Sequence, residues 1–267
     1  SRGNPTIEVD VILNNGIVGR SAVPSGASTG IYEALELRDS SSSKFSGMGV
    51  LQAIKNVEHH IKPLLINKPI NNIKEIDTTM IEADSTSNKR KFGANSILGV
   101  SLAALHAGAL SAQQPLFQYI NNLYNFKMKM PIPMMNILNG GSHADNKVDI
   151  QEFMIMPIKA KTFKNALRIG SEIFHTLKKI LKEKKLITAV GDEGGFAPDL
   201  QSNEEALVLL TEAISESGYK VGEDIKFALD VAASELYNST TSKYELRSEN
   251  LELTSNEMIE YYSRLCS

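Results

Sequence analysis

Apolar and polar residues alternate at the start of the chain. Between Ile7 and Leu13 they follow a two-residue period, and a second run of this kind covers residues 17–23. Asn14-Asn15-Gly16 separates the two runs, and this residue type at this place favours a tight turn with positive φ at Gly16. The pattern predicts an antiparallel β-hairpin.

The period then changes to that of a helix. Apolar residues between 50 and 61 recur at three- and four-residue spacing, and Pro63 is expected to end that helix. Asn95 is expected to cap a second helix over residues 96–112, which is apolar on most faces and therefore predicted to be buried. Up to about residue 125 the chain is thus predicted to have an α+β fold, with a small antiparallel sheet packed on helices.

A polar, Pro-containing stretch at residues 121–131 marks the expected domain boundary, which gives domains 1–125 and 126–267. Beyond it, strand and helix patterns alternate, which predicts a parallel α/β arrangement. Capping boxes at Ser202 and Thr254 open two of the helices. The other expected elements are strands at 132–138, 151–157 and 225–231, and a helix at 166–181.

A TIM-like barrel fits this alternation, but such a barrel needs about 250 residues. Only residues 130–267 are left for it, and the chain stops just after a capped helix. Because open sheet edges are normally avoided, we expect an incomplete α/β barrel in a partial chain. The start, which lacks Met and runs directly into a strand pattern, leads to the same expectation.

Composition narrows the class of protein. The chain has 267 residues, 42% of them hydrophobic, and a net charge of −3, which is typical of a soluble globular protein without a nucleic-acid partner. We see no signal peptide, and no apolar run of the roughly 18 residues that a membrane span needs. Cys266 is the only cysteine, so no internal disulfide can form, which favours the cytoplasm.

The segment from Val190 to Pro198 carries the clearest candidate chemistry. Asp192 and Glu193 are adjacent carboxylates with glycines on both sides. Glycine allows positive φ and close approach to a ligand, and acids on a loop are well placed for proton transfer or metal binding. An ordinary solvated acidic turn is the alternative.

Two further segments carry candidate residues. His143 ends a Gly-Gly-Ser-His loop and is suited to bind a phosphate or orient an acid, while Glu152 begins a strand. A surface histidine and a structural glutamate are the alternative. Asp230 lies near the end of an apolar strand, where an acid needs a cation or an ion-pair partner; a plain buried ion pair stays open.

The loop from Ser25 to Gly30 is rich in glycine and serine but lacks the Lys of a P-loop, so a flexible connection is the simplest interpretation. His59 and His60 are expected to be exposed helix residues rather than metal ligands.

Six segments together resemble the enolase family, specifically its bacterial type. They occur in order across nearly the whole chain: Ser1–Thr6, Ser25–Gly30, Phe92–Ser101, Asn139–Asp145, Asp149–Met154 and Gly191–Gly195. The chain departs from the bacterial pattern at Ser142, where Glu is usual, and at Met48, where Lys is usual.

The resemblance implies an enolase-type barrel behind an N-terminal capping domain. It also implies the reversible dehydration of 2-phosphoglycerate to phosphoenolpyruvate with two Mg²⁺ ions. By resemblance, Glu193 is the general acid, Glu152 and His143 lie beside the substrate, and Gln151 helps to position it. Asp230 binds the first Mg²⁺, and Ser28, on a closing loop, binds the second and contacts the substrate.

The same resemblance puts the Lys general base and two further Mg²⁺ ligands beyond Ser267, so this chain alone is expected to be inactive. It implies a homodimer or larger oligomer with Arg2 and Glu8 near the interface. It also implies a cytoplasmic location, with a cell-surface or secreted form as an option. A non-catalytic binding protein is the main alternative; a racemase-like relative is disfavoured, because such relatives lack the Ser25–Gly30 loop and the acidic turn together.

Overall fold

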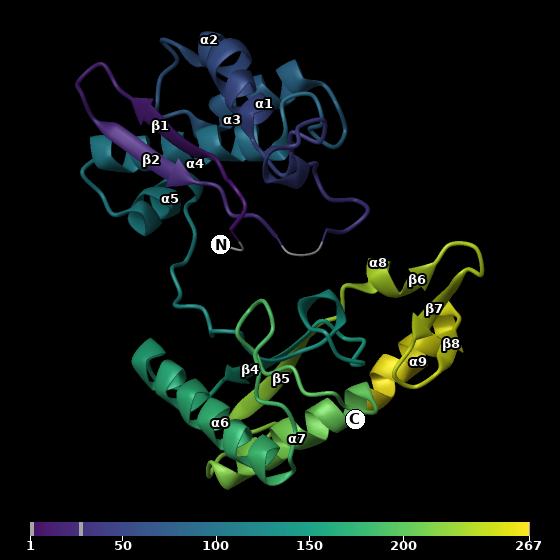
Figure 1. Ribbon diagram of the computed structural model, residues 1–267. Coiled ribbons are helices and arrows are strands. Elements are labelled where there is room, and N and C mark those ends of the chain that lie inside the picture. Colours follow the sequence, from purple (N-terminus) through teal and green to yellow (C-terminus); the bar gives the residue numbers. More distant parts are fainter. Residues whose placement is uncertain (1–2, 27–28, 267) are drawn as a thin grey trace. The chain divides into compact units, whose positions relative to one another are not determined.

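The computed structural model describes residues 3–26 and 29–266. They form two compact units, and each is described here by itself. Residues 3–26 with 32–128 make unit 1, and residues 29–31 with 129–266 make unit 2 (Figure 1). The candidate residue Ser28 and the expected interface residue Arg2 lie outside the described part of the chain.

Unit 1 contains the predicted hairpin. Strands β1 (Glu8–Ile12) and β2 (Val18–Ala22) pair antiparallel, with Glu8 opposite Ala22. Gly16 has a φ of 83°, a value that glycine adopts without a Cβ clash. The turn chemistry of the sequence therefore predicted both the pairing and its direction.

Helices complete unit 1, and α4 is its centre: ten of its eighteen residues are buried, and it packs against both strands. Figure 1 shows β1 and β2 crossing it. The helical elements are η1 (Lys44–Gly47), α1 (Leu51–Asn56), η2 (Val57–Ile61), α2 (Lys62–Leu65), α3 (Ile73–Asp84), α4 (Ala94–Ser111) and α5 (Leu116–Tyr124). The α+β expectation for this part of the chain is confirmed.

Helix α4 is also long and apolar enough to cross a membrane by length and composition, which the sequence reading had missed. Just over half of it is buried, against the hairpin and neighbouring helices, which is the usual setting of a core helix. Burial within unit 1 thus accounts for its composition.

The expected cap at Asn95 is wrong. Helix α4 begins after Gly93, whose φ is 93°, and Asn95 lies inside its first turn, buried. Its side-chain amide bonds both backbone groups of Leu37, accepting from the N–H and donating to the carbonyl, each at 3.1 Å. The Asn95 amide therefore satisfies the backbone groups of Leu37, which is distant in sequence, and does not cap the helix.

Pro63 does not end its helix either. Residues 57–61 form a π-helical turn, in which the Lys62 amide bonds the Val57 carbonyl five residues back. Pro63 then falls in the first turn of α2, where its missing N–H matters least, and the helix continues to Leu65. The wider turn accommodates the proline ring.

The sheet of unit 2 has the order β3-β4-β5, with strands Met135–Asn139, Glu152–Pro157 and Ile225–Asp230. Both pairings are antiparallel, so the predicted parallel arrangement is wrong for these strands. A loop without an α-helix turns the chain back between β3 and β4. Two helices in series, rather than one, connect β4 to β5, so the chain re-enters the sheet from the opposite end.

Helices α6 (Phe163–Glu183) and α7 (Asn203–Glu216) pack on each other, and α6 also packs on β4 (Figure 1). Thr162 and Ser202 cap them through bonds from the amides of Asn165 and Glu205. Of the capping box expected at Ser202, only this half is present, because the Glu205 carboxylate bonds the Gln201 amide instead. The main core of unit 2 lies between these helices and the sheet.

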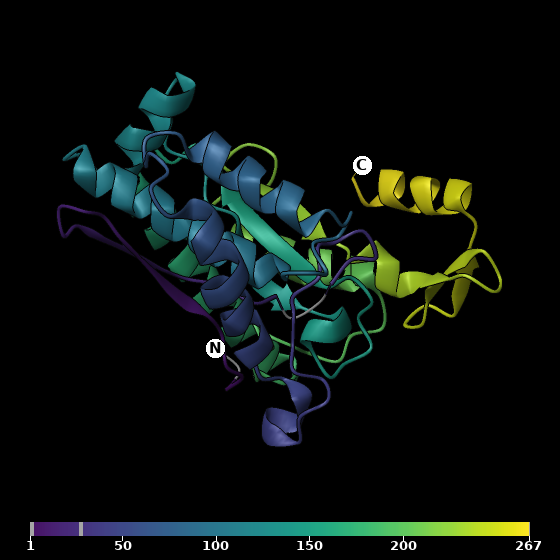
Figure 2. The same cartoon turned by 90° about the horizontal axis from the view of Figure 1, so that it is seen from above.

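The C-terminal part of unit 2 has a small core of its own around Leu246, Met258 and Tyr261. The Thr254 capping box is complete and opens α9, as predicted. Figure 2 shows α9 at one end of this unit. The elements here are α8 (Ala233–Leu236), β6 (Tyr237–Asn238), β7 (Lys243–Leu246), β8 (Leu251–Leu253) and α9 (Ser255–Leu265), with the strands antiparallel.

Candidate active site

The antiparallel register of unit 2 brings three polar residues to one edge of the sheet. Asn139, the last residue of β3, lies opposite Glu152, the first of β4, and Glu152 lies opposite Asp230, the last of β5. In a parallel sheet the start of β4 would lie at the other edge. The direction of the strands, which sequence reasoning got wrong, is therefore what places Glu152 beside Asp230.

The loop after β3 carries the short helix η3 (Gly141–His143) and is tied to the chain ahead of β4. Gly140 donates to the Gln151 carbonyl at 3.0 Å, and Gly141 donates to that of Val148 at 2.7 Å. A Cβ on Gly140 would come within 2.6 Å of the Val148 carbonyl oxygen, so only glycine fits. This close packing holds His143 over the edge of the sheet, with Nδ1 3.3 Å from Glu152 Oε1.

The acidic turn is fixed on both sides. Phe196 donates to the Ile137 carbonyl at 2.9 Å, and Asp192 donates to the His143 carbonyl at 3.1 Å. A Cβ on Gly191 would lie 2.4 Å from that same His143 oxygen. The glycines thus let the turn press against the His143 loop, and Glu193 is held where the two segments meet.

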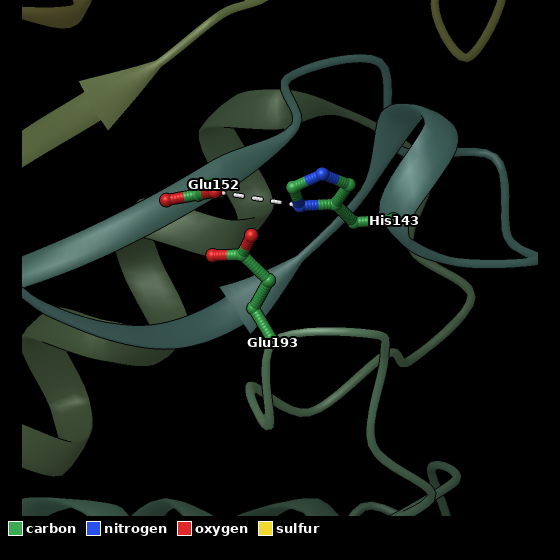
Figure 3. Close-up of side chains that lie close together, drawn as sticks. All are labelled: His143, Glu152 and Glu193. Atoms are coloured by element: carbon green, nitrogen blue, oxygen red, sulfur yellow. Dashed lines mark ion pairs between the residues drawn. The ribbon is translucent and has the colours of Figure 1, made fainter. Parts of the chain in front are cut away.

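His143, Glu152 and Glu193 converge from three separate segments, with one ligand atom of each within 4.8 Å of the others (Figure 3). His143 and Glu152 are 4% and 9% exposed, whereas Glu193 is exposed. Neither ring nitrogen of His143 has a hydrogen-bond partner within the described chain. A buried imidazole and two carboxylates therefore face a common point that is open to solvent on the Glu193 side.

Negative charge accumulates at this point. Burial raises the pKa of the Glu152 carboxyl to about 7, and the hydrogen-bonding contact with Glu193 and the charges of Glu193 and Asp230 add to the effect. Within the described residues, no Lys or Arg forms an ion pair with any of these three acids. At neutral pH, Glu152 is therefore balanced between its protonated and ionised forms, as a group that exchanges protons must be.

Asp230 is exposed, so the alternative of a buried ion pair is wrong. Its Oδ1 accepts from the Ala232 amide at 3.1 Å, and its Oδ2 accepts from Gln151 Nε2 at 3.4 Å. Gln151 itself is 3% exposed. Two donors thus orient the Asp230 carboxylate while leaving acceptor positions on both of its oxygens.

The sequence reading missed Asn139 and the role of Ser142. Asn139 is fully buried, and its Oδ1 has no partner in the described chain. The sequence does contain an indication for Asn139, since this polar residue follows an apolar run as Asp230 does. Ser142 donates to Gln151 Oε1 at 3.0 Å, which no sequence pattern indicates.

These side chains form a group that could hold a metal ion. Carboxylate oxygens with no cationic partner in the described chain fit a hard divalent cation, since such an ion would relieve the repulsion that raises the Glu152 pKa. The residues present therefore fit the chemistry of a metal site, although the structure holds no ion.

Comparison with known proteins gives the family. The model of the enolase N-terminal domain matches residues 1–120, and that of the enolase C-terminal TIM barrel domain matches residues 127–267. The chain belongs to the enolase family. An enolase from Legionella pneumophila (strain Lens) is 56% identical over all 267 residues. The chain spans 62% of the length of that enolase.

The matches confirm the expected fold class for this enolase-family chain, an N-terminal α+β domain followed by part of a TIM barrel domain. The described strands of unit 2 form open sheets and no closed barrel. The domain that matches the barrel contains the candidate site residues His143, Gln151, Glu152, Glu193 and Asp230.

Proposed function

We propose that the full-length gene product that contains this chain catalyses the reversible dehydration of 2-phosphoglycerate to phosphoenolpyruvate. The observation that carries the proposal is the convergence of Glu152, Glu193 and His143 at the sheet edge, with the Glu152 pKa near neutrality. The 56% identity to an enolase over the whole chain supports the same reaction.

In this proposal Glu193 is the general acid that protonates the departing hydroxide. It is exposed on a fixed turn and contacts a carboxyl whose pKa is about 7. Carboxyls of like charge in contact do not both ionise readily, so at neutral pH Glu152 still carries a proton in part of the molecules. Glu152 and His143 contact the substrate hydroxyl and phosphate, and Gln151 helps to position the substrate.

We propose Mg²⁺ as the metal, with Asp230 as a ligand that holds it in the absence of substrate. When bound, Mg²⁺ supplies positive charge that stabilises the charge developing on the substrate carboxylate after the α-proton is removed. Ser28 is proposed as a ligand of a second Mg²⁺ on the resemblance alone.

The full-length Glu193→Gln variant tests the acid. We expect kcat for dehydration to fall by at least about 10²-fold, the scale for losing a general acid. Exchange of the substrate α-proton with solvent should persist better, because another residue removes that proton. Both rates are followed on one preparation, the first by absorbance of the enol product and the second by NMR.

Asp192→Asn is the matched control, since it removes one charge from the same exposed turn without touching the Glu152 carboxyl. We expect it to retain kcat within about threefold. Equal losses of dehydration and exchange in Glu193→Gln, or equal effects of the two variants, would contradict the assignment of the acid.

We also propose a cytoplasmic homodimer or larger oligomer. Cys266 as the only cysteine agrees with a reducing compartment. Glu8, expected near the interface, is an exposed residue of strand β1 and lies 3.5 Å from Arg20 on β2. Light scattering on the full-length product measures the oligomeric state.

A further inference from the structure

We propose that Ser142 is a positioning residue that anchors the Gln151 side chain and, through it, the Asp230 carboxylate. This inference rests on the proposed function, because it concerns how the Mg²⁺ ligand is held ready. It assigns a role to one of the two residues at which the chain departs from the bacterial pattern.

A chain of two hydrogen bonds connects the three side chains. Ser142 Oγ donates to Gln151 Oε1 at 3.0 Å, and Gln151 Nε2 donates to Asp230 Oδ2 at 3.4 Å. The residues come from η3, the segment leading into β4, and the end of β5. The bonds thus link three segments that are distant in sequence.

The chemistry of the groups leaves one orientation for the amide. An ionised carboxylate only accepts hydrogen bonds, so the amide NH₂ must face Asp230 and its oxygen must face Ser142. Ser142 then has to act as the donor, which a hydroxyl can do. Turning the amide by half a turn would place its oxygen against the Asp230 carboxylate. The carboxylate therefore decides which way the amide faces, and the Ser142 bond holds the Gln151 side chain in that place.

Removing the hydroxyl affects a buried group. Gln151 is 3% exposed, so its Oε1 would lose the Ser142 donor with little access to water. The Gln151 side chain would then be held less firmly in its place. The Oδ2 of Asp230 would then lose its donor for part of the time, while Oδ1 keeps the bond from Ala232. A less fixed carboxylate is a weaker ligand for a cation with strict geometry.

The test compares Ser142→Ala with Ser142→Thr in the full-length protein. We expect Ser142→Ala to weaken substrate-free Mg²⁺ binding about fivefold, the scale of one neutral hydrogen bond. The Mg²⁺ concentration for half-maximal activity should rise by the same factor, while kcat at saturating Mg²⁺ stays within twofold. Ser142→Thr keeps the hydroxyl at an exposed position and should restore the wild-type values. Calorimetric titration with Mg²⁺ alone gives the affinity.

Ser217→Ala is the control, since it removes a serine hydroxyl that bonds Thr176 and the Ala213 carbonyl, far along α7. It should leave Mg²⁺ affinity unchanged. Unchanged affinity in Ser142→Ala, or a Ser142→Thr variant as weak as Ser142→Ala, overturns the inference while the proposed function stands. A wild-type full-length protein without dehydratase activity overturns the proposed function itself.

Discussion

At the scale of single residues, Glu152 is an acid in an unusual environment. Its carboxyl is nearly buried, faces two other acids, and has a pKa of about 7 instead of its ordinary value of 4.5. In the unfolded chain the carboxyl returns to the ordinary value. The native state therefore binds more protons than the unfolded state between these two pH values.

The sign of the resulting pH dependence follows directly. The favourable contribution of protonated Glu152 is complete below about pH 4.5 and is lost as pH rises towards 7. We expect the wild-type free energy of unfolding to fall between pH 5 and pH 8 by up to about 3 kcal/mol more than that of Glu152→Gln, which has no carboxyl to ionise. Urea denaturation with a metal chelator present measures both curves.

Asp199→Asn serves as the control, because Asp199 is an exposed acid paired with Lys147 on the same unit. Its pH profile should parallel that of the wild type. If the Glu152→Gln profile also ran parallel to the wild type, burial and the neighbouring acids would not be raising the pKa of this carboxyl.

At the scale of elements, the buried side chain of Asn203 joins three parts of unit 2. Its Oδ1 accepts from the amides of Asp149 and Ile150 at 3.1 and 3.0 Å, and its Nδ2 donates to the Tyr261 hydroxyl at 3.0 Å. Asp149 in turn accepts from the Arg247 amide at 2.7 Å and from the Ser248 hydroxyl. The start of α7, the β7–β8 turn and α9 are thereby tied to the segment that leads into Gln151 and Glu152.

Asn203→Ala should destabilise the protein by about 2–4 kcal/mol, because it leaves two buried backbone N–H groups without an acceptor. The urea midpoint reports this loss. Ser202→Ala, one residue earlier, removes only the N-cap bond to Glu205 and should cost about 1 kcal/mol. Similar losses in the two variants would mean that Asn203 is only another part of the helix start.

At the scale of the whole molecule, the chain spans 62% of the length of the enolase it matches. The described edge of unit 2 offers carboxylates and one histidine, and none of these acids forms an ion pair with a described lysine. Mg²⁺ requires near-octahedral oxygen coordination, for which Asp230 supplies at most two oxygens. Under the proposed function, complete Mg²⁺ coordination therefore needs ligands beyond Asp230, and the base for the α-proton is another such group.

We accordingly expect purified residues 1–267 to show no dehydration of 2-phosphoglycerate above background, whereas the full-length product is active. Absorbance of the enol product at saturating Mg²⁺ measures both. The Glu193→Gln form of residues 1–267, purified in parallel, defines the background from host enzyme. A rate in residues 1–267 that this substitution removes would show that the chain is catalytically sufficient.

The sequence by itself determined the local features. The turn at Gly16, the capping box at Thr254, the buried character of α4 and the candidate acids Glu152, Glu193 and Asp230 all followed from residue type and spacing. These features depend on interactions within a few residues, or on a periodicity that is visible along the chain. The family resemblance could also be recognised from the sequence, because it rests on short runs of neighbouring residues.

Tertiary structure alone decided how these parts meet. Asn95 does not cap helix α4, because its side-chain amide forms hydrogen bonds with both backbone groups of Leu37. Strands β4 and β5 pair antiparallel, and this direction brings Glu152 beside Asp230. The raised pKa of Glu152 and the Ser142–Gln151 bond arise between segments far apart in sequence. Strand direction, burial and such contacts depend on the path of the whole chain, which local periodicity does not encode.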